Sequence, residues 1–371
     1  MNPRLTALQV VTDCLTPDQA GDKIDALHRQ IISGRIPWEN VVELANNHLL
    51  APALWSALQE KGLTEDLPVD LVAYLQELHA LSRQRNARLL QQLRQAVKAL
   101  NAVGIEPVLL KGAYHLVSTL YGDTGVRIMS DIDLLVAPEA VQPAFHALLS
   151  LGYGVDEESL DDYQADHHHC PPLFRPGDYA AIEIHRELME DFGSILSAEE
   201  ALADSRSFMF DGLSLRVLSP THRLLHNLLH SQLVDAHHQH GVIPLRSLYE
   251  AVVEVKHSPA PMDWASINRR MQARGQGPVL NAYLFMAHHL FALSLPRGHR
   301  ATAGAYGHYL RCCAQLAWDW FAVWGLRWGR FSTNNIRRLY ACGDSFFAVN
   351  WARLRFACRL VARRYNCRRW A

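Results

Sequence analysis

The sequence predicts an α+β protein in which a small mixed β-sheet is flanked by N- and C-terminal helical segments. Three observations predict this fold class. Apolar residues recur at helical spacing up to about residue 103, short apolar runs alternate with helical stretches over 104–215, and helical spacing returns from about residue 219. Alternating strand and helix signals are typical of a sheet with helices packed against it. With 371 residues, of which 49% are hydrophobic, the chain can bury substantial cores.

We divide the chain into four regions on this basis. They are a helical N-terminal region (1–103), a core (104–215), a helical domain (216–300) and an arginine-rich helical tail (301–371). The clearest helix of the first region is predicted at 83–103, and Gly104 ends its apolar pattern. In the third region, "SPTHRLLHNLLHSQL" opens with a Ser-Pro helix start, and further helices are predicted from Trp264 to about 295.

The elements of the core follow one another at short intervals. In chain order the apolar runs predict a strand at 107–110, a helix at 112–121, a strand at 131–136, a helix from Pro138 to Gly152, and strands near 153–157, 168–175 and 179–186. The turn signal "RPGDY" joins the last two strands. These elements together indicate a compact α/β unit inside the helical chain.

Two aspartates alternate with apolar residues in the strand at 131–136. Successive strand side chains point to opposite faces, so Asp131 and Asp133 share one face while Ile132 and Leu134 point into a core. Neighbouring carboxylates repel each other unless a cation lies between them. The pair therefore indicates a cation site, although an exposed strand face with ordinary solvated acids gives the same pattern.

A third acid stands in "AAIEIHREL", where Glu183 and His185 share a face. If this strand lies beside the strand of Asp131, Glu183 completes a cluster of three carboxylates that suits Mg²⁺. Two such ions ~3.5–4 Å apart can activate an attacking oxygen and neutralise a leaving pyrophosphate. The alternative for Glu183 is a cross-strand salt bridge.

A Lys-Gly pair closes the first strand of the core. Gly112 at a helix start lets a phosphate approach backbone N–H groups, and Lys111 adds a positive charge. The alternatives are a solubilising lysine at a strand end and a tight turn. Arg127, just before the two aspartates, is either a further phosphate ligand or a partner of Asp123 or Asp131.

The stretch "LLKG…YGDTGVRIMSDIDLLV…LLSLGY…IEIH" resembles a bacterial family of uncharacterised nucleotidyltransferases within the DNA polymerase β-like superfamily. The resemblance is close over about 105–190, and "SPTHRLLHNLLHSQL" and "DWASINRRM" resemble the helical part of the same family less specifically. It implies a nucleotidyltransferase-type sheet, a nucleoside triphosphate substrate and two Mg²⁺ ions. The implied catalytic and metal-binding residues are Asp131, Asp133 and Glu183, and the implied nucleotide-binding residues are Lys111, Gly112, Arg127 and Ser130.

We therefore expect a Mg²⁺-dependent enzyme that transfers a nucleoside monophosphate from an NTP such as ATP to an acceptor, releasing pyrophosphate. Acceptors within the superfamily include small molecules, sugars, proteins and nucleic acid ends, and the sequence does not select among them. Lys-Gly replaces the superfamily's Gly-Ser, and this departure supports an alternative: a catalytically inactive nucleotide- or partner-binding protein that retains the fold.

Twenty histidines raise a third hypothesis, a histidine-ligated zinc hydrolase. "DHHHC" at 166–170 has ligand-like spacing, and so have His222, His226 and His230 at i, i+4 and i+8, but no H-E-x-x-H or CxxC motif accompanies them. His226 and His230 lie among leucines, which also fits buried, hydrogen-bonded side chains. We expect His169 and His185 to be neighbours of the nucleotide pocket.

Composition limits the class of partner and the compartment. The net charge of −1 gives no argument for a nucleic-acid partner, and seven scattered cysteines without CxxC spacing suit reduced thiols in a cytoplasm. Neither a signal peptide nor a clean transmembrane segment is evident. Seven arginines and no acid follow from Trp351, so the segment 351–371 either contacts a membrane surface or nucleic acid, or is a helical cap with solvated or paired arginines.

Overall fold

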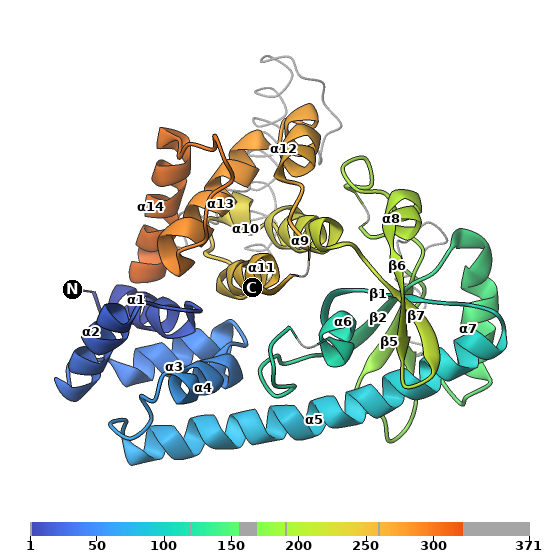
Figure 1. Ribbon diagram of the computed structural model, residues 1–371, viewed down its shortest axis with the longest axis horizontal. Helices are drawn as coiled ribbons and strands as arrows, with labels where there is room; N and C mark the ends of the chain where they lie inside the picture. Colours follow the sequence, from blue (N-terminus) through green and yellow to red (C-terminus); the bar gives the residue numbers. More distant parts are fainter. Residues whose placement is uncertain (1, 119, 156–168, 190, 259, 322–371) are drawn as a thin grey trace, which may run out of the picture.

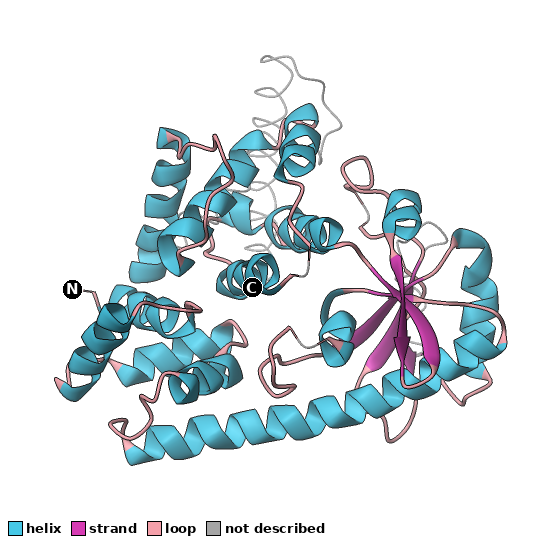
Figure 2. Cartoon of the chain, in the orientation of Figure 1, coloured by secondary structure: helices cyan, strands magenta, loops and turns pink. Residues whose placement is uncertain are grey.

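A computed structural model of the protein describes residues 2–118, 120–155, 169–189, 191–258 and 260–321. One mixed seven-stranded sheet lies at one end of the molecule, and helices from before and after it in the sequence form the rest (Figures 1 and 2). The predicted α+β class, with a mixed sheet between two helical segments, is confirmed. The predicted strand positions 156–157 and 168, the first part of "DHHHC" and the segment 351–371 lie outside the described residues.

The N-terminal helices lead into one long helix. They are α1 (Pro3–Leu15), α2 (Gly21–Ile32), α3 (Trp38–Asn47), α4 (Ala51–Glu60) and the 34-residue α5 (Val69–Ala102). At 1.5 Å per residue α5 is roughly 51 Å long, and it runs from the N-terminal helices to the sheet (Figure 1). The helix predicted at 83–103 is its C-terminal half, and it ends as expected before Gly104, whose φ is 78°.

The sheet has the strand order β3-β4-β5-β2-β1-β7-β6. The strands are β1 (Val108–Leu109), β2 (Asp131–Leu135), β3 (Gly154–Val155), β4 (Leu173–Phe174), β5 (Ala181–His185), β6 (Arg206–Phe210) and β7 (Leu213–Val217). Strand β2 pairs in parallel with β5 and antiparallel with β1. Asp133 lies directly opposite Glu183 in this register, so the expected neighbouring of the two acidic strands is confirmed.

The structure differs from the expected core in two respects. The helix predicted at 112–121 is the shorter α6 (Lys111–Val117), and the hairpin β6–β7 with the preceding α8 (Ala198–Asp204) was not predicted. Strand β6 is an edge strand whose first four residues are all exposed, so its sequence "RSFMF" lacks the alternation that marks a half-buried strand. A helical turn η1 (Pro138–Ala140) and α7 (Val141–Leu149) form the predicted helix that follows β2.

Helices return after the sheet as expected. They are α9 (Pro220–Leu229), a π-helical turn η3 (His230–Val234), α10 (His237–His240), α11 (Leu245–His257), α12 (Trp264–Ala273), α13 (Gly277–Phe291) and α14 (Ala303–Ala317). The predicted Ser-Pro start is confirmed, because the Ser219 hydroxyl accepts the His222 backbone N–H at the start of α9. Within the described ranges, no helix has the length and apolar character needed to cross a membrane.

Two hydrophobic cores hold these elements together. The larger joins residues from both ends of the chain, for example Val11 of α1 with Leu228 of α9 and Tyr283 of α13. The smaller lies at the sheet, where Ile132 of β2 and Ile182 of β5 pack with the C-terminal half of α5. Helix α5 contributes Leu71 and Leu75 to the first core and a second set of side chains, Leu89, Leu93, Ala96, Val97 and Leu100, to the other. The acidic face of β2 and β5 is thereby fixed relative to the helices that follow the sheet.

Candidate active site

The acidic cluster is built by one face of the neighbouring strands β2 and β5. Asp131 and Asp133 of β2 and Glu183 and His185 of β5 share this face, because side chains alternate along a strand and the two strands run in parallel register. Ligand atoms of Asp133, Glu183 and His185 all lie within 4.8 Å of one another. Asp131 lies on the same face, two residues before Asp133, and is not a member of this group of three. His185, expected as a pocket neighbour, thus lies inside the cluster itself.

Asp133 is the buried centre of the cluster. Its side chain has no exposed surface, and its Oδ1 accepts hydrogen bonds from Lys111 Nζ at 2.8 Å and His185 Nε2 at 2.9 Å. Burial alone would raise the pKa of Asp133, but the Lys111 ammonium and the hydrogen bond from His185 hold it far below its usual range. The second oxygen, Oδ2, is buried and has no hydrogen-bond partner among the described residues. An ionised carboxylate with one unsatisfied buried oxygen offers a ligand position for a cation.

Two histidines lie near Glu183: His185 on the same strand, and His169, which is bridged to His185. Glu183 Oε2 lies 3.5 Å from His185 Nε2 and 3.9 Å from His169 Nε2, and His169 pairs with His185 across an isolated β-bridge. Burial acts to raise the pKa of Glu183, but the hydrogen bond from His185 and the charges of His169 and His185 together lower it. His169 and His185 therefore both contact the acidic cluster, although neither lines the cavity described below. The closer of the two histidines, His185, lies on the same strand as Glu183, so this contact is not the cross-strand salt bridge considered from the sequence.

Asp131 stands where the cluster meets a cavity. It is half-buried, and its pKa is raised by burial and by the charge of Asp133, while Lys111 acts in the opposite direction. A hydrogen bond from the Ser130 side chain also favours its ionised form. Three carboxylates with a single lysine among them form the oxygen-rich set that suits a hard divalent cation such as Mg²⁺. The residues present therefore fit such an ion: Asp133 and Glu183 belong to the group that could hold a metal ion, and Asp131 adds a third carboxylate on the same face.

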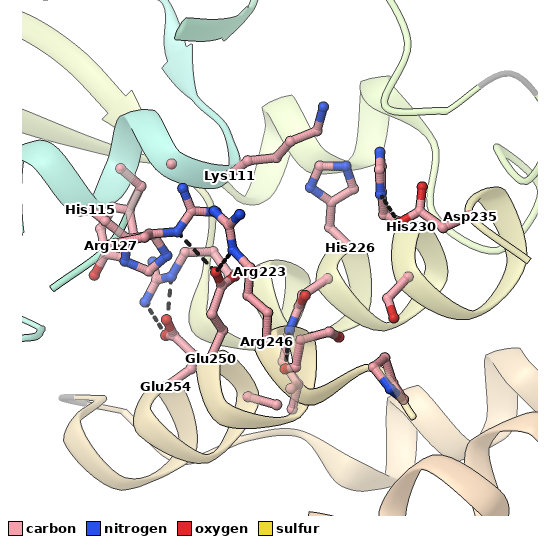
Figure 3. Close-up of a pocket in the computed structure, with 18 of the residues that line it drawn as sticks. Lys111, His115, Arg127, Arg223, His226, His230, Asp235, Arg246, Glu250 and Glu254 are labelled. Carbon is pink, nitrogen blue, oxygen red and sulfur yellow. Dashed lines mark hydrogen bonds and ion pairs between the residues drawn. The ribbon is translucent and has the colours of Figure 1, made fainter. Parts of the chain in front are cut away.

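The cavity has a volume of about 310 Å³ and lies between α6 with the start of β2 and the helices α9 and α11 (Figure 3). Its lining includes all the residues that the sequence implied for nucleotide binding, namely Lys111, Gly112, Arg127 and Ser130, together with Asp131. Residues 19 apart in the sequence, Lys111 and Ser130, thus meet at one cavity wall. The volume is within the usual range for a small-ligand site.

Arginine–carboxylate pairs form one end of the cavity. Glu250 of α11 accepts from Arg127 Nε at 2.9 Å and from Arg246 Nε at 3.0 Å, and Arg223 Nε donates to Glu254 at 3.1 Å (Figure 3). Although burial acts to raise it, the charges of Arg127 and Arg246 hold the pKa of Glu250 at about 2. We call this group, Arg127, Arg223, Arg246, Glu250 and Glu254, the arginine end. The alternative partners considered for Arg127 are wrong: it pairs with Glu250, and Asp123 binds Arg83 Nε at 3.3 Å instead.

Gly112 is required by its contact with Arg127. A Cβ at this position would lie 2.2 Å from Arg127 Nη1 and 2.9 Å from Met129 Cε, so a larger residue must displace the ends of these side chains. The preceding Lys111 has a φ of 42°, in the left-handed region that costs a non-glycine residue about 1–2 kcal/mol. Strained backbone of this kind clusters at functional sites, and here it directs Lys111 toward Asp133.

We expect Gly112→Ala to weaken nucleotide binding at least tenfold, because the new methyl group must displace the Arg127 guanidinium from the cavity wall. Gly307→Ala on α14 is the matched control, since a Cβ there meets nothing within 4 Å. Titration of both variants with Mg²⁺ and each NTP checks the difference. Equal affinity in the two variants would show that the contact between Gly112 and Arg127 has no part in binding.

Imidazoles form the opposite end of the cavity. His226 and His230 of α9 and η3 project into it, and Asp235 and His237 follow directly in the chain (Figure 3). We call His48, His226, His230, Asp235 and His237 the histidine end. The sequence pattern suggested that His222, His226 and His230 converge as metal ligands, but His222 binds Asp204 at 3.3 Å and His230 binds Asp235 at 3.2 Å. Among the described residues, none of the three belongs to a group that could hold a metal ion.

Sequence reasoning missed the residues that α11 supplies, Arg246, Glu250 and Glu254. The Arg-x-x-x-Glu spacing of Arg246 and Glu250 is a helical i, i+4 pair, which normally indicates an exposed salt bridge. Only the tertiary fold shows that this pair is buried against Arg127, which lies 123 residues from Glu250 in the chain. Asp235 was missed because its pairing with His230 depends on the π-helical turn.

Comparison with known proteins agrees with this site. A family model described as "uncharacterised nucleotidyltransferase" matches residues 34–292, which is more than half of the chain and includes the acidic cluster and every residue of the arginine end. No curated protein matches the chain. The sequence resemblance, the paired acidic strands and the family match agree, and the chain belongs to the uncharacterised nucleotidyltransferase family.

Proposed function

We propose that this protein is a Mg²⁺-dependent nucleotidyltransferase that moves a nucleoside monophosphate from an NTP to an acceptor and releases pyrophosphate. The observation that carries the proposal is Asp133, whose buried Oδ2 is unsatisfied among the described residues; Asp133 lies opposite Glu183 in the sheet and is bonded to Lys111, which lines the cavity together with Asp131. The family match supports the reaction class.

In this proposal Asp131, Asp133 and Glu183 hold the divalent cation, and two ions fit the reaction best. When bound, such ions supply positive charge that neutralises the leaving pyrophosphate. Lys111 stands between Asp133 and the cavity, so its ammonium group can reach the phosphates of a nucleotide bound there. Gly112, Ser130 and Arg127 line the same wall and complete the nucleotide site.

The positive charge of the arginine end favours binding of the triphosphate group of the NTP. Two guanidinium groups, Arg127 and Arg246, share the single carboxylate of Glu250, which leaves one positive charge in a buried setting. Burial and the charge of Arg127 lower the pKa of Arg246, so an anion bound nearby would stabilise its charged form. We therefore place the phosphates between Lys111 and the arginine end.

One observation favours the second candidate, a catalytically inactive nucleotide- or partner-binding protein. Lys111 and His185 already satisfy one oxygen of Asp133, and Asp133 is fully buried, so protein groups could replace a metal ion permanently. This candidate keeps nucleotide binding in the cavity but predicts no pyrophosphate release with any acceptor.

We also propose a cytoplasmic location and retain the four-region division of the chain. Cys14, Cys170, Cys312 and Cys313 are free thiols in the structure, which supports a reducing compartment. Cys342, Cys358 and Cys367 lie outside the described residues. Four chemical classes of acceptor fit this reaction: small molecules, sugars, proteins and nucleic acid ends.

The first test is isothermal titration of the protein with ATP, GTP, CTP and UTP, with and without Mg²⁺. We expect at least one nucleotide to bind in the micromolar range with Mg²⁺ and at least tenfold more weakly without it, because the acidic cluster repels phosphates unless a cation neutralises it. Pyrophosphate release in a parallel assay separates the enzyme from the inactive candidate. If none of the four nucleotides binds, both candidates are wrong.

A further inference from the structure

The histidine end of the cavity is chemically unlike the arginine end, and the proposed reaction leaves it unused. Burial lowers the pKa of His48 to about 4, and burial together with the charge of Lys111 lowers the pKa of His226 to about 3, so both rings are neutral near pH 7. Asn227 and Ser231 add neutral hydrogen-bonding groups to the same lining. This end has no arginine or lysine to attract a phosphate, and its neutral donors and acceptors suit hydroxyl groups.

His226 carries an unsatisfied atom in this lining. Its side chain is 3% exposed, and its Nε2 is buried without a hydrogen-bond partner among the described residues. Leaving a buried polar atom unpaired costs about 1–3 kcal/mol. A ligand in the cavity that hydrogen-bonds to Nε2 would recover this energy, so His226 marks a ligand position that protein groups do not fill.

His230, one helical turn further on, is held by a carboxylate. Its Nδ1 lies 3.2 Å from Asp235 Oδ2, and a carboxylate can only accept, so Nδ1 carries a proton and Nε2 is the atom of the neutral ring that can accept one. Burial acts to raise the pKa of Asp235, but the hydrogen bond from His230 lowers it, which keeps Asp235 charged. The pair thus has the arrangement of a general base oriented by an acid.

Local backbone geometry holds this pair in place. His230 begins the π-helical turn η3, and Ala236, directly after Asp235, has a φ of 56° in the left-handed region. Single π-helical turns and strained non-glycine residues both concentrate at functional sites. The rings of His226 and His230 lie 6.3 Å apart, edge to face, and Lys111 acts electrostatically on both His226 and Asp235. The histidine end is therefore adjacent to the acidic cluster.

We propose that the histidine end is the acceptor subsite, that it takes a small neutral polyhydroxyl compound, and that His230, oriented by Asp235, is the catalytic base for the acceptor hydroxyl. This inference rests on the proposed function. Glu183 is a poorer base for this step because it is already hydrogen-bonded by His185 and does not line the cavity. A nucleic acid acceptor is disfavoured because no arginine belongs to the histidine end and Asp235 places a negative charge there.

In the proposed transfer, the acceptor oxygen forms a bond to the α-phosphorus of the NTP, and its proton passes to Nε2 of His230. The bond between the α-phosphorus and the bridging oxygen breaks, and its electron pair leaves with pyrophosphate. No oxidant or reductant is needed. His226 Nε2 hydrogen-bonds to the acceptor and fixes its position, and Asp235 stabilises the imidazolium that forms on His230.

The test uses the full chain, Mg²⁺, the NTP that binds best, and glycerol, myo-inositol, D-glucose and D-ribose as probe acceptors, with water as the smallest hydroxyl. Pyrophosphate release and mass spectrometry of the nucleotidyl product are the readouts. We expect His230→Gln to lower kcat by about a hundredfold or more while the KM for the NTP stays within about twofold. Asp235→Asn should lower kcat by a smaller factor, and the KM for the NTP should again stay within about twofold. His28→Gln, which breaks the surface His28–Asp66 pair, is the matched control and should change neither constant.

Three results would contradict the base, the acceptor class and the proposed function, respectively. If His230→Gln keeps kcat within threefold of the wild type on an accepted probe, His230 is not the base. If the wild type binds Mg²⁺ and NTP but transfers to none of the probes, the polyhydroxyl acceptor is wrong while the nucleotide site stands. If the wild type binds no nucleotide, the proposed function itself fails.

Discussion

Asp133→Asn is expected to abolish Mg²⁺-dependent nucleotide binding and to lower pyrophosphate release by on the order of a thousandfold or more. The amide keeps the size of the side chain but removes the charge that binds a divalent cation. It also removes the negative charge that Lys111 and His185 now share at 2.8 Å and 2.9 Å. Because Asp133 is fully buried and paired with Lys111, the loss of its charge also lowers the free energy of unfolding, so circular dichroism and urea denaturation are used to verify that the variant is folded in the assay.

Two companion variants sharpen this test. Asp131→Asn should cause a similar loss of turnover, because Asp131 joins the cluster to the cavity. Asp211→Asn is the control: its carboxylate lies in the β6–β7 turn of the same sheet and forms an exposed ion pair with Arg94. Full activity in Asp133→Asn or Asp131→Asn would contradict the proposed metal site, and a loss in Asp211→Asn would point to a general effect on the sheet.

Glu250→Gln is expected to lower the free energy of unfolding by roughly 3–5 kcal/mol, which is the usual cost of breaking a buried ion pair. Glu250 is the shared partner of Arg127 and Arg246, and its side chain is only 13% exposed. Without its charge the two guanidinium groups face each other in a buried setting. Urea denaturation of Glu250→Gln beside Glu77→Gln, an exposed position on α5, measures the difference. Equal stability of the two variants would show that the Arg127–Glu250–Arg246 group contributes nothing to the fold.

The same carboxylate gives the stability a defined dependence on pH. The pKa of Glu250 is about 2 in the folded chain against its ordinary value of 4.5, so the folded state binds its proton less tightly than the unfolded state. Its stabilising contribution is therefore fully present above about pH 4.5 and is lost as the pH falls toward 2. Glu250→Gln should remove this part of the acid sensitivity, which urea midpoints measured between pH 3 and pH 7 would show.

Strand alternation predicted the part of the candidate site that depends on local sequence. The shared face of Asp131 and Asp133 and the position of Glu183 opposite Asp133 follow from a repeat of two residues, once the two strands are neighbours. The same logic fails for β6, whose exposed edge position leaves no alternating pattern. Local periodicity carries information only where one face of an element is buried.

The remaining contacts of the site join residues that no local pattern connects. The pairs Lys111–Asp133, Arg127–Glu250 and Arg223–Glu254 span 22, 123 and 31 residues of the chain. The spacing of His226 and His230 suggested that they bind one metal ion together. In the structure, among the described residues, His230 pairs with Asp235 and neither histidine belongs to a group that could hold a metal ion. Charged partners are chosen by tertiary packing, which a single sequence does not specify.

The larger hydrophobic core, which joins α1 to α9 and α13, has a consequence for the order of folding. Val11 and Tyr283 belong to the same core although about 270 residues separate them, so the first helices, which also pack against one another, cannot complete the burial of their apolar surface until most of the chain has left the ribosome. The core at the sheet draws only on residues between Leu89 and Val217 and has a lower contact order. We therefore expect the sheet to form first during synthesis, with α5 already attached, and the N-terminal helices to wait in a partly exposed state. That interval is when the nascent chain is most open to chaperones and to aggregation.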